Sequence, residues 1–93
     1  MKRSSRYTSL HQNARHQLIN ARAIVQQSEV WLATAKVQLG MAEEFANSAS
    51  GRFVLVAQRE LADAQVLVQW MEMRLHAAKS KLRMAEEWAA AHR

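Results

Sequence analysis

The residues of this chain best suited to hold a metal ion are four histidines, His11, His16, His76 and His92. His11 and His16 are five residues apart, so they point to different sides of a helix, whereas the two histidines of a helical zinc motif are spaced by four. His76 lies among apolar residues, as expected for a side chain at the rim of a packed face. There is no cysteine to add a thiolate ligand. We therefore expect no metal site.

Two pairs of glutamates, Glu43-Glu44 and Glu86-Glu87, are the other candidates for chemistry. Consecutive residues of a helix point in different directions, so neither pair forms one site. A di-iron bundle needs inward-facing Glu-x-x-His motifs, and the sequence has none. No serine is spaced with a histidine and a carboxylate as in a nucleophilic triad, and no glycine-rich phosphate loop occurs. The sequence predicts no catalytic residue, no cofactor and no small-molecule substrate, and hence a protein that is not an enzyme.

The basic residues are concentrated at one end of the expected fold. The formal net charge is +5. Residues 1–28 hold five basic residues and no acidic one, whereas residues 29–93 hold eight of each. An antiparallel hairpin would bring basic residues of the C-terminal half to the same end. We define the basic end as Arg6, Arg15, Arg22, Lys79, Lys81 and Arg83.

This basic end has three interpretations. It can bind nucleic-acid phosphates, because Lys and Arg contacts release counterions. It can instead meet an acidic protein surface, or it can be ordinary solvated charge with a flexible arm. The chain has no recognised nucleic-acid motif, aromatic platform or zinc spacing. Nucleic acid is therefore an alternative partner and not the first choice.

The elements that position these residues are predicted to be helices. The 93 residues include no proline, only two glycines (Gly40 and Gly51) and much alanine, the best helix former. Hydrophobic residues make up 49% of the chain but aromatic residues only 6%, which favours an all-α protein. No apolar run approaches the roughly 20 residues of a membrane span. The basic N-terminus is followed by polar residues and not by the apolar core of a signal peptide. We expect a cytoplasmic protein that does not enter a membrane.

The two halves of the chain are similar at an offset of 43 residues. Over residues 14–46, fifteen of 33 positions are identical to the residue 43 further on. The clearest match joins Met41-Ala-Glu-Glu44 with Met84-Ala-Glu-Glu87. Two unrelated heptad helices would align best at a multiple of seven, yet at an offset of 42 only three positions match. The sequence therefore indicates an internal duplication of 14–46 as 57–89, as in proteins built from repeated helical units.

One segment interrupts the helical pattern. The segment Asn47-Ser-Ala-Ser-Gly51 contains residues whose side chains compete for helical hydrogen bonds. It ends in a glycine, which can take positive φ. Thr8 or Ser9 could cap the start of a first helix. We predict one helical-hairpin domain over 1–93, with a flexible basic arm at 1–7, a helix at 8–47, a turn at 48–51 and a helix at 52–91. A single continuous helix is the competing interpretation.

Heptad repeats predict the seam between the two helices. Small residues recur every seven positions beside a second series of larger ones, as in a coiled coil. In the first helix the two series are Ala14, Ala21, Ser28, Ala35, Ala42 and Ala49, and Leu18, Val25, Leu32, Leu39 and Ala46. In the second they are Ala57, Ala64, Met71, Ala78 and Ala85, and Leu61, Val68, Leu75, Leu82 and Ala89. A turn centred near Ser50 would set Ala42 opposite Ala57 and Ala35 opposite Ala64. A register slipped by a few residues would instead set small residues against large ones.

Further apolar residues lie outside this seam, and Ile24 and Trp31 flank it. A helix that is apolar over so much of its circumference is usually buried on two sides. The residues predicted to bind a partner are Val66, Trp70, Met73 and Ala77 in the second helix, and Ile19, Val30, Val37 and Met41 in the first. They would bury against a second copy in a homodimeric four-helix bundle, or against a different helical partner.

The predicted fold is therefore an all-α antiparallel helical hairpin of two long helices with an alanine-rich coiled-coil seam, which pairs into a four-helix bundle. The predicted function is protein–protein interaction without catalysis, as an adaptor, small chaperone, antagonist or assembly subunit. The alternative is a basic helical bundle that binds nucleic acid through its positively charged end.

Overall fold

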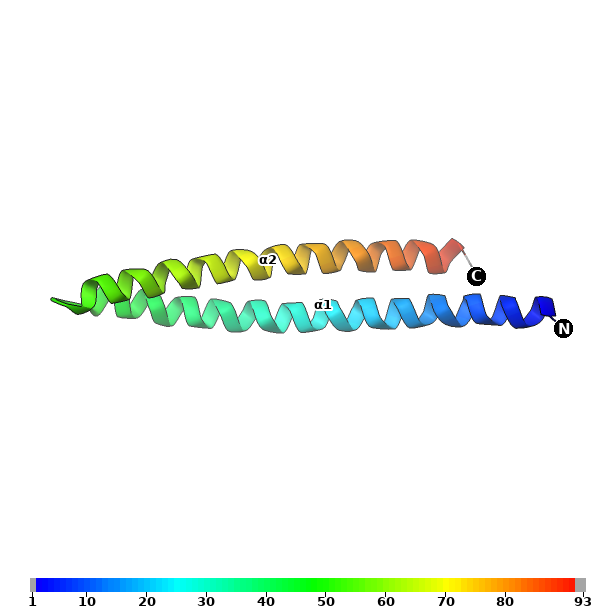
Figure 1. The fold of residues 1–93 in the computed structure, drawn as a ribbon, viewed down its shortest axis with the longest axis horizontal. Helices are drawn as coiled ribbons and strands as arrows, with labels where there is room; N and C mark the ends of the chain where they lie inside the picture. The colour runs from blue at the N-terminus through cyan, green and yellow to red at the C-terminus, as the bar shows by residue number, and fades with distance from the viewer. Residues whose placement is uncertain (1, 92–93) are drawn as a thin grey trace. The chain divides into compact units, whose positions relative to one another are not determined.

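The computed structural model describes residues 2–91 and, within them, the side chains of Leu10 and of residues 12–91. Helix α1 spans Lys2–Ser48 and helix α2 spans Phe53–Ala91, and the described range contains no strand (Figure 1). The two helices run antiparallel and pack against each other. The predicted all-α helical hairpin is therefore confirmed, and the pairing of two hairpins into a four-helix bundle stays a prediction.

A short turn that depends on one glycine joins the two helices. At the end of α1 the Ala49 amide donates a hydrogen bond to the Phe45 carbonyl oxygen at 2.9 Å. Gly51 has a φ of +60°, a conformation that costs a residue with a Cβ atom about 1–2 kcal/mol. The amide of Phe53 then donates to the Ser50 carbonyl oxygen at 3.2 Å, which starts α2. The turn begins and ends one residue later than predicted, and its glycine has the expected conformation.

The start of α1 differs from the prediction. The helix begins at Lys2 and not at the predicted residue 8, so the described part of the segment 1–7 is helical. Thr8 and Ser9 lie within the helix and do not cap it. The physical reason is that no proline or glycine interrupts this segment. A threonine or serine inside a helix costs less than about 0.7 kcal/mol relative to alanine, which is too little to end one.

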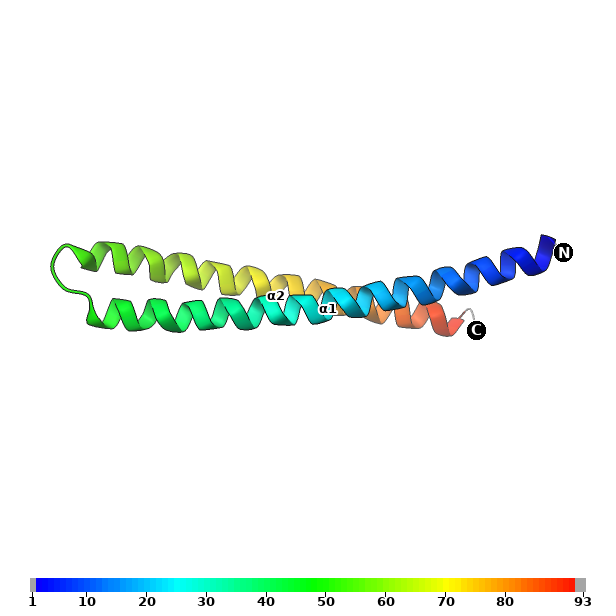
Figure 2. The same cartoon turned by 90° about the horizontal axis from the view of Figure 1, so that it is seen from below.

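The chain forms two compact units. Unit 1 comprises residues 1–27 and 76–93, and unit 2 comprises residues 28–75. In unit 2 the last part of α1 and the first part of α2 lie side by side around the turn, as two views show (Figures 1 and 2). In unit 1 the first part of α1 pairs with the last part of α2. Each unit therefore consists of two antiparallel helical segments.

The buried residues follow the predicted seam. In heptad notation the small series occupies position d and the larger series position a. Every buried side chain in the described range belongs to one of these series: Ala14, Ala21, Val25, Ser28, Ala35, Ala57, Val68 and Ala78. Ala35 and Ala57 are the most enclosed, with 2% and 1% of their surface exposed. The remaining seam residues are half-buried and none is exposed, so the alanine-rich seam is confirmed.

The residues that line the space between the helices indicate the register of unit 2. Ala42 lines the same pocket as Ala64, whereas a register centred on the turn would pair Ala42 with Ala57. Ala35 lines a second pocket with Met71 and without Ala64. Unit 2 therefore follows a slipped register and not the one centred on the turn.

Candidate partner-binding surfaces

The eight residues predicted to bind a partner are all exposed in the hairpin. Trp70 and Met73 keep 65% and 70% of their surface exposed, although both are large and apolar. Their exposure follows from the seam, because packing of α1 against α2 covers positions a and d most, and Trp70 and Met73 lie at positions c and f. Large apolar patches are uncommon on monomeric proteins and usually identify sites of association.

In unit 2 these residues lie on the outer sides of the two helices. Val30 and Val37 occupy position f of α1, and Val66 and Met73 occupy position f of α2. Position f points away from the seam, so the two outer sides face in opposite directions. Trp70, at position c, lies beside the outer side of α2. The structure therefore does not bring the predicted residues of the two helices together into one patch.

The other three predicted residues lie elsewhere. Ile19 and Ala77 belong to unit 1, where Ile19 lines a shallow hollow with Arg15 and His16. Met41 belongs to unit 2 and lines a groove that the sequence pattern did not reveal.

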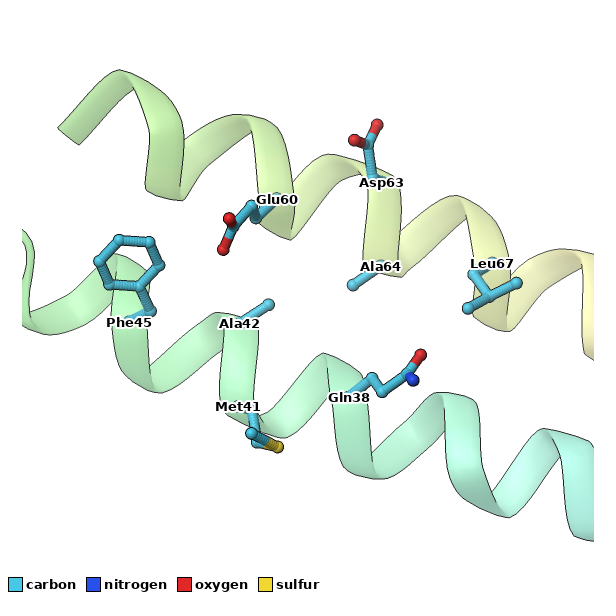
Figure 3. A pocket seen from close by; sticks show the side chains of 8 residues that line it. All are labelled: Gln38, Met41, Ala42, Phe45, Glu60, Asp63, Ala64 and Leu67. Carbon is cyan, nitrogen blue, oxygen red and sulfur yellow. The ribbon is translucent and has the colours of Figure 1, made fainter. Parts of the chain in front are cut away.

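This groove lies on one side of the seam, between α1 and α2 of unit 2. We define the unit 2 groove by its wall residues at position g, which are Trp31, Gln38 and Phe45 of α1 and Glu60, Leu67 and Arg74 of α2. Alanines at position d, among them Ala42 and Ala64, form its floor because their side chains are short. Figure 3 shows Phe45 and Glu60 projecting toward the space between the helices, whereas Asp63 points away from α1. This part of the groove has a volume of about 480 Å³.

The two ends of the groove carry opposite charges. At one end the Arg74 guanidinium carbon lies 5.5 Å from the centroid of the Trp31 ring, within the range of a cation–π contact. At the other end Phe45 lies beside Glu60, whose carboxylate projects toward the space between the helices. Each end therefore combines an aromatic ring with a charge, and the sign of the charge is reversed between them.

The middle of the groove is formed by Gln38 and Leu67. Both residues line the pocket at the acidic end and the pocket at the basic end, so the two pockets are continuous. On each helix the wall residues are seven positions apart, or about 10 Å along the axis at 1.5 Å per residue. The ends of the groove are therefore about 20 Å apart, with Gln38 and Leu67 midway.

The opposite side of the seam in unit 2 is polar. Position e, which borders that side, holds only exposed charged or amide residues: Glu29, Lys36, Glu43, Gln58, Gln65 and Glu72. No large apolar side chain occupies this position in unit 2. Unit 2 thus has one face with an apolar groove and one polar face, a difference that a symmetric apolar stripe would not produce.

The residues of the basic end lie in unit 1, most of them on one side of the seam. The exposed members are Arg15, Arg22, Lys79, Lys81 and Arg83, and the side chain of Arg6 lies outside the described ones. Lys81 lines a pocket with Ile24 and Ala78. Arg15, Arg22 and Lys79 occupy position e on the other side of the seam, and Arg83 occupies the neighbouring position b. Four of the five exposed basic residues therefore lie on one side of unit 1, and Lys81 lies on the other.

The unit 2 groove was missed at the level of sequence although a signal for it exists. Trp31 flanks the seam in the sequence pattern, and Phe45 and Leu67 hold the same heptad position in their helices. A series of large residues at position g beside small residues at position d predicts an open groove with apolar walls.

Among the residues that the structure describes, no group of three histidines or carboxylates could hold a metal ion.

Comparison with known proteins adds no relative. No family model, no curated protein and no solved structure matches the chain. Within the described range, neither helix has a stretch long and apolar enough to cross a membrane.

Proposed function

We propose that this chain is a non-enzymatic protein–protein interaction module, of the adaptor, small chaperone, antagonist or assembly-subunit kind. It binds a second copy of itself or another helical protein through apolar residues outside the seam. The observation that carries this proposal is the exposure of Trp70 and Met73 after the hairpin has formed. We place the protein in the cytoplasm, as its sequence predicts.

The proposal has a simple energetic basis. Burial of a large apolar side chain contributes about 1.5–3 kcal/mol, and side chains at positions c and f obtain little of this within the hairpin. Six of the eight predicted residues lie in unit 2, so this unit offers most of the surface that association could bury. The alternative, nucleic-acid binding, has less support because the chain has no recognised nucleic-acid motif or aromatic platform.

Substituting Trp70→Glu together with Met73→Glu tests the proposal. The double variant is expected to associate at least about a hundredfold more weakly, since two apolar burials of about 1.5 kcal/mol are lost. Its helix content by circular dichroism should equal that of the wild type, because neither residue is part of the seam. Sedimentation velocity, or binding to a helical partner once one is known, measures the association.

The matched control is Gln65→Glu with Gln69→Glu, which adds the same charge to the same helix at exposed polar positions. Equal weakening by both double variants would mean that net charge and not the apolar surface controls association. A separate variant, in which Arg15, Arg22, Lys79 and Lys81 are all replaced by glutamine, tests the alternative function. Salt-sensitive nucleic-acid binding that is lost in this variant alone would favour the alternative.

A further inference from the structure

We infer that the unit 2 groove is closed by a second copy of this chain, related to the first by a two-fold axis at the level of Gln38 and Leu67. This inference rests on the proposed function, for which it names a second copy as the partner and adds the groove as a contact surface distinct from Trp70 and Met73. The partner is the same chain because the groove is complementary to itself when its direction is reversed.

The charges at the two ends of the groove provide this complementarity. Glu60 and Arg74 both occupy position g of α2 and are four helical turns apart, or about 21 Å. A two-fold axis across the groove at Leu67 exchanges its two ends. Glu60 of each copy then lies against Arg74 of the other, and symmetry makes this contact between opposite charges twice.

The orientation of the second copy follows from the same charges. If the turns of both copies lay at the same end, both Glu60 carboxylates would lie at one end of the interface and both Arg74 guanidinium groups at the other, and gathering like charges in this way is unfavourable. The antiparallel orientation avoids this. It also places Trp31 of each copy over Phe45 of the other, which buries two aromatic rings at each end of the groove.

The size of the face is adequate for such a dimer. The helical segments of unit 2 extend for about 30 Å at 1.5 Å per residue. Two packed helices form a face about 20 Å wide, since each is about 10 Å in diameter. The resulting area of about 600 Å² in projection, before side-chain relief is counted, approaches the 800 Å² or so that each partner buries in a standard interface.

Charge reversal tests the two-fold geometry. In the proposed dimer, the single substitution Glu60→Arg sets two positive charges against each other at both ends, and Arg74→Glu alone sets two negative charges there. Each variant is therefore expected to self-associate at least about tenfold more weakly than the wild type. An equimolar mixture of the two variants should restore association, because every end contact between the different chains again joins opposite charges. Glu60 and Arg74 are four turns apart on one helix, so an effect within a single chain cannot produce this rescue. Absence of rescue in the mixture overturns the inference.

Cross-linking tests the position of the axis independently of charge. The chain has no cysteine, so a single introduced thiol reports only on its own position. Gln38→Cys lies at the level of the axis, where the two copies of this residue approach, and is expected to form a disulfide-linked dimer under mild oxidation. Gln65→Cys is equally exposed but lies on the polar side, and it should stay unlinked. Equal linking of both variants, or of neither, contradicts the proposed axis.

The two sets of variants separate failure of this inference from failure of the proposed function. If the wild type stays monomeric in sedimentation at every concentration, the groove inference is overturned, while binding of a different helical protein through Trp70 and Met73 would still satisfy the proposed function. A second outcome is that the wild type dimerises, that Trp70→Glu with Met73→Glu abolishes the dimer, and that the charge reversals at Glu60 and Arg74 have no effect. The two copies would then pair through their outer sides, and the groove inference alone would be overturned. The result we expect is rescue in the mixture together with cross-linking at Gln38→Cys alone.

Discussion

Replacing each of the two glycines by alanine is expected to change the stability of the hairpin in opposite directions. Gly40 lies inside α1, and Gly51 lies in the turn with a φ of +60°. A Cβ atom added at either position would meet no atom within 4 Å apart from the neighbouring residues and, for Gly40, the adjacent backbone of its own helix. Steric packing is therefore equal in the two cases, and the sign of the effect depends on the backbone alone.

The magnitudes follow from the backbone conformations. Gly40→Ala removes conformational freedom from the unfolded chain at a helical position, and should stabilise the fold by about 0.5–1 kcal/mol. The equivalent position of the second copy carries Arg83, so the helix accommodates a side chain there. Gly51→Ala places a Cβ atom in the left-handed region and should destabilise by about 1 kcal/mol, after the gain in the unfolded state is subtracted.

Urea and thermal unfolding followed by circular dichroism measure both effects. For a chain of this size a change of 1 kcal/mol shifts Tm by about 4–8 °C, so the two variants should fall on opposite sides of the wild type. The measurements need one protein concentration throughout, because self-association would also raise Tm. A loss of stability in Gly40→Ala would refute the reasoning for α1, and an unchanged or raised Tm in Gly51→Ala would refute the left-handed turn.

Two further variants test the seam. Ala35→Leu adds volume where only 2% of the alanine is exposed, and should destabilise by about 1–3 kcal/mol. Ala33→Leu, on the exposed side of the same helix, should change stability by less than about 0.5 kcal/mol, and equal urea midpoints for the two variants would contradict the packing. Ser28→Ala replaces the buried polar residue of the described seam and should stabilise by about 0.5 kcal/mol, because alanine has the higher helix propensity. A lower Tm for Ser28→Ala would show that its hydroxyl makes a stabilising contact.

The seam and the turn could be predicted from sequence because both depend on local patterns. A residue such as Ala57 is buried because it recurs in a heptad series, and the period of a helix is a property of the chain itself. Gly51 could be assigned to the turn because a glycine readily takes positive φ. The start of α1 was predicted less well, since Thr8 and Ser9 suit a helix interior nearly as well as a cap, and no stronger signal stops the helix before them.

The sequence by itself determined that this protein is an antiparallel helical hairpin, which residues form its seam, and which apolar side chains are left outside. These follow from periodicity, composition and one glycine. The tertiary structure alone decided the register of unit 2, which sets Arg74 beside Trp31 and Glu60 beside Phe45. Register depends on how side chains of two distant segments fill the space between them, and heptad spacing repeats identically after a slip of seven residues. The groove and the opposite charges at its ends therefore became visible only when the two helices were placed together.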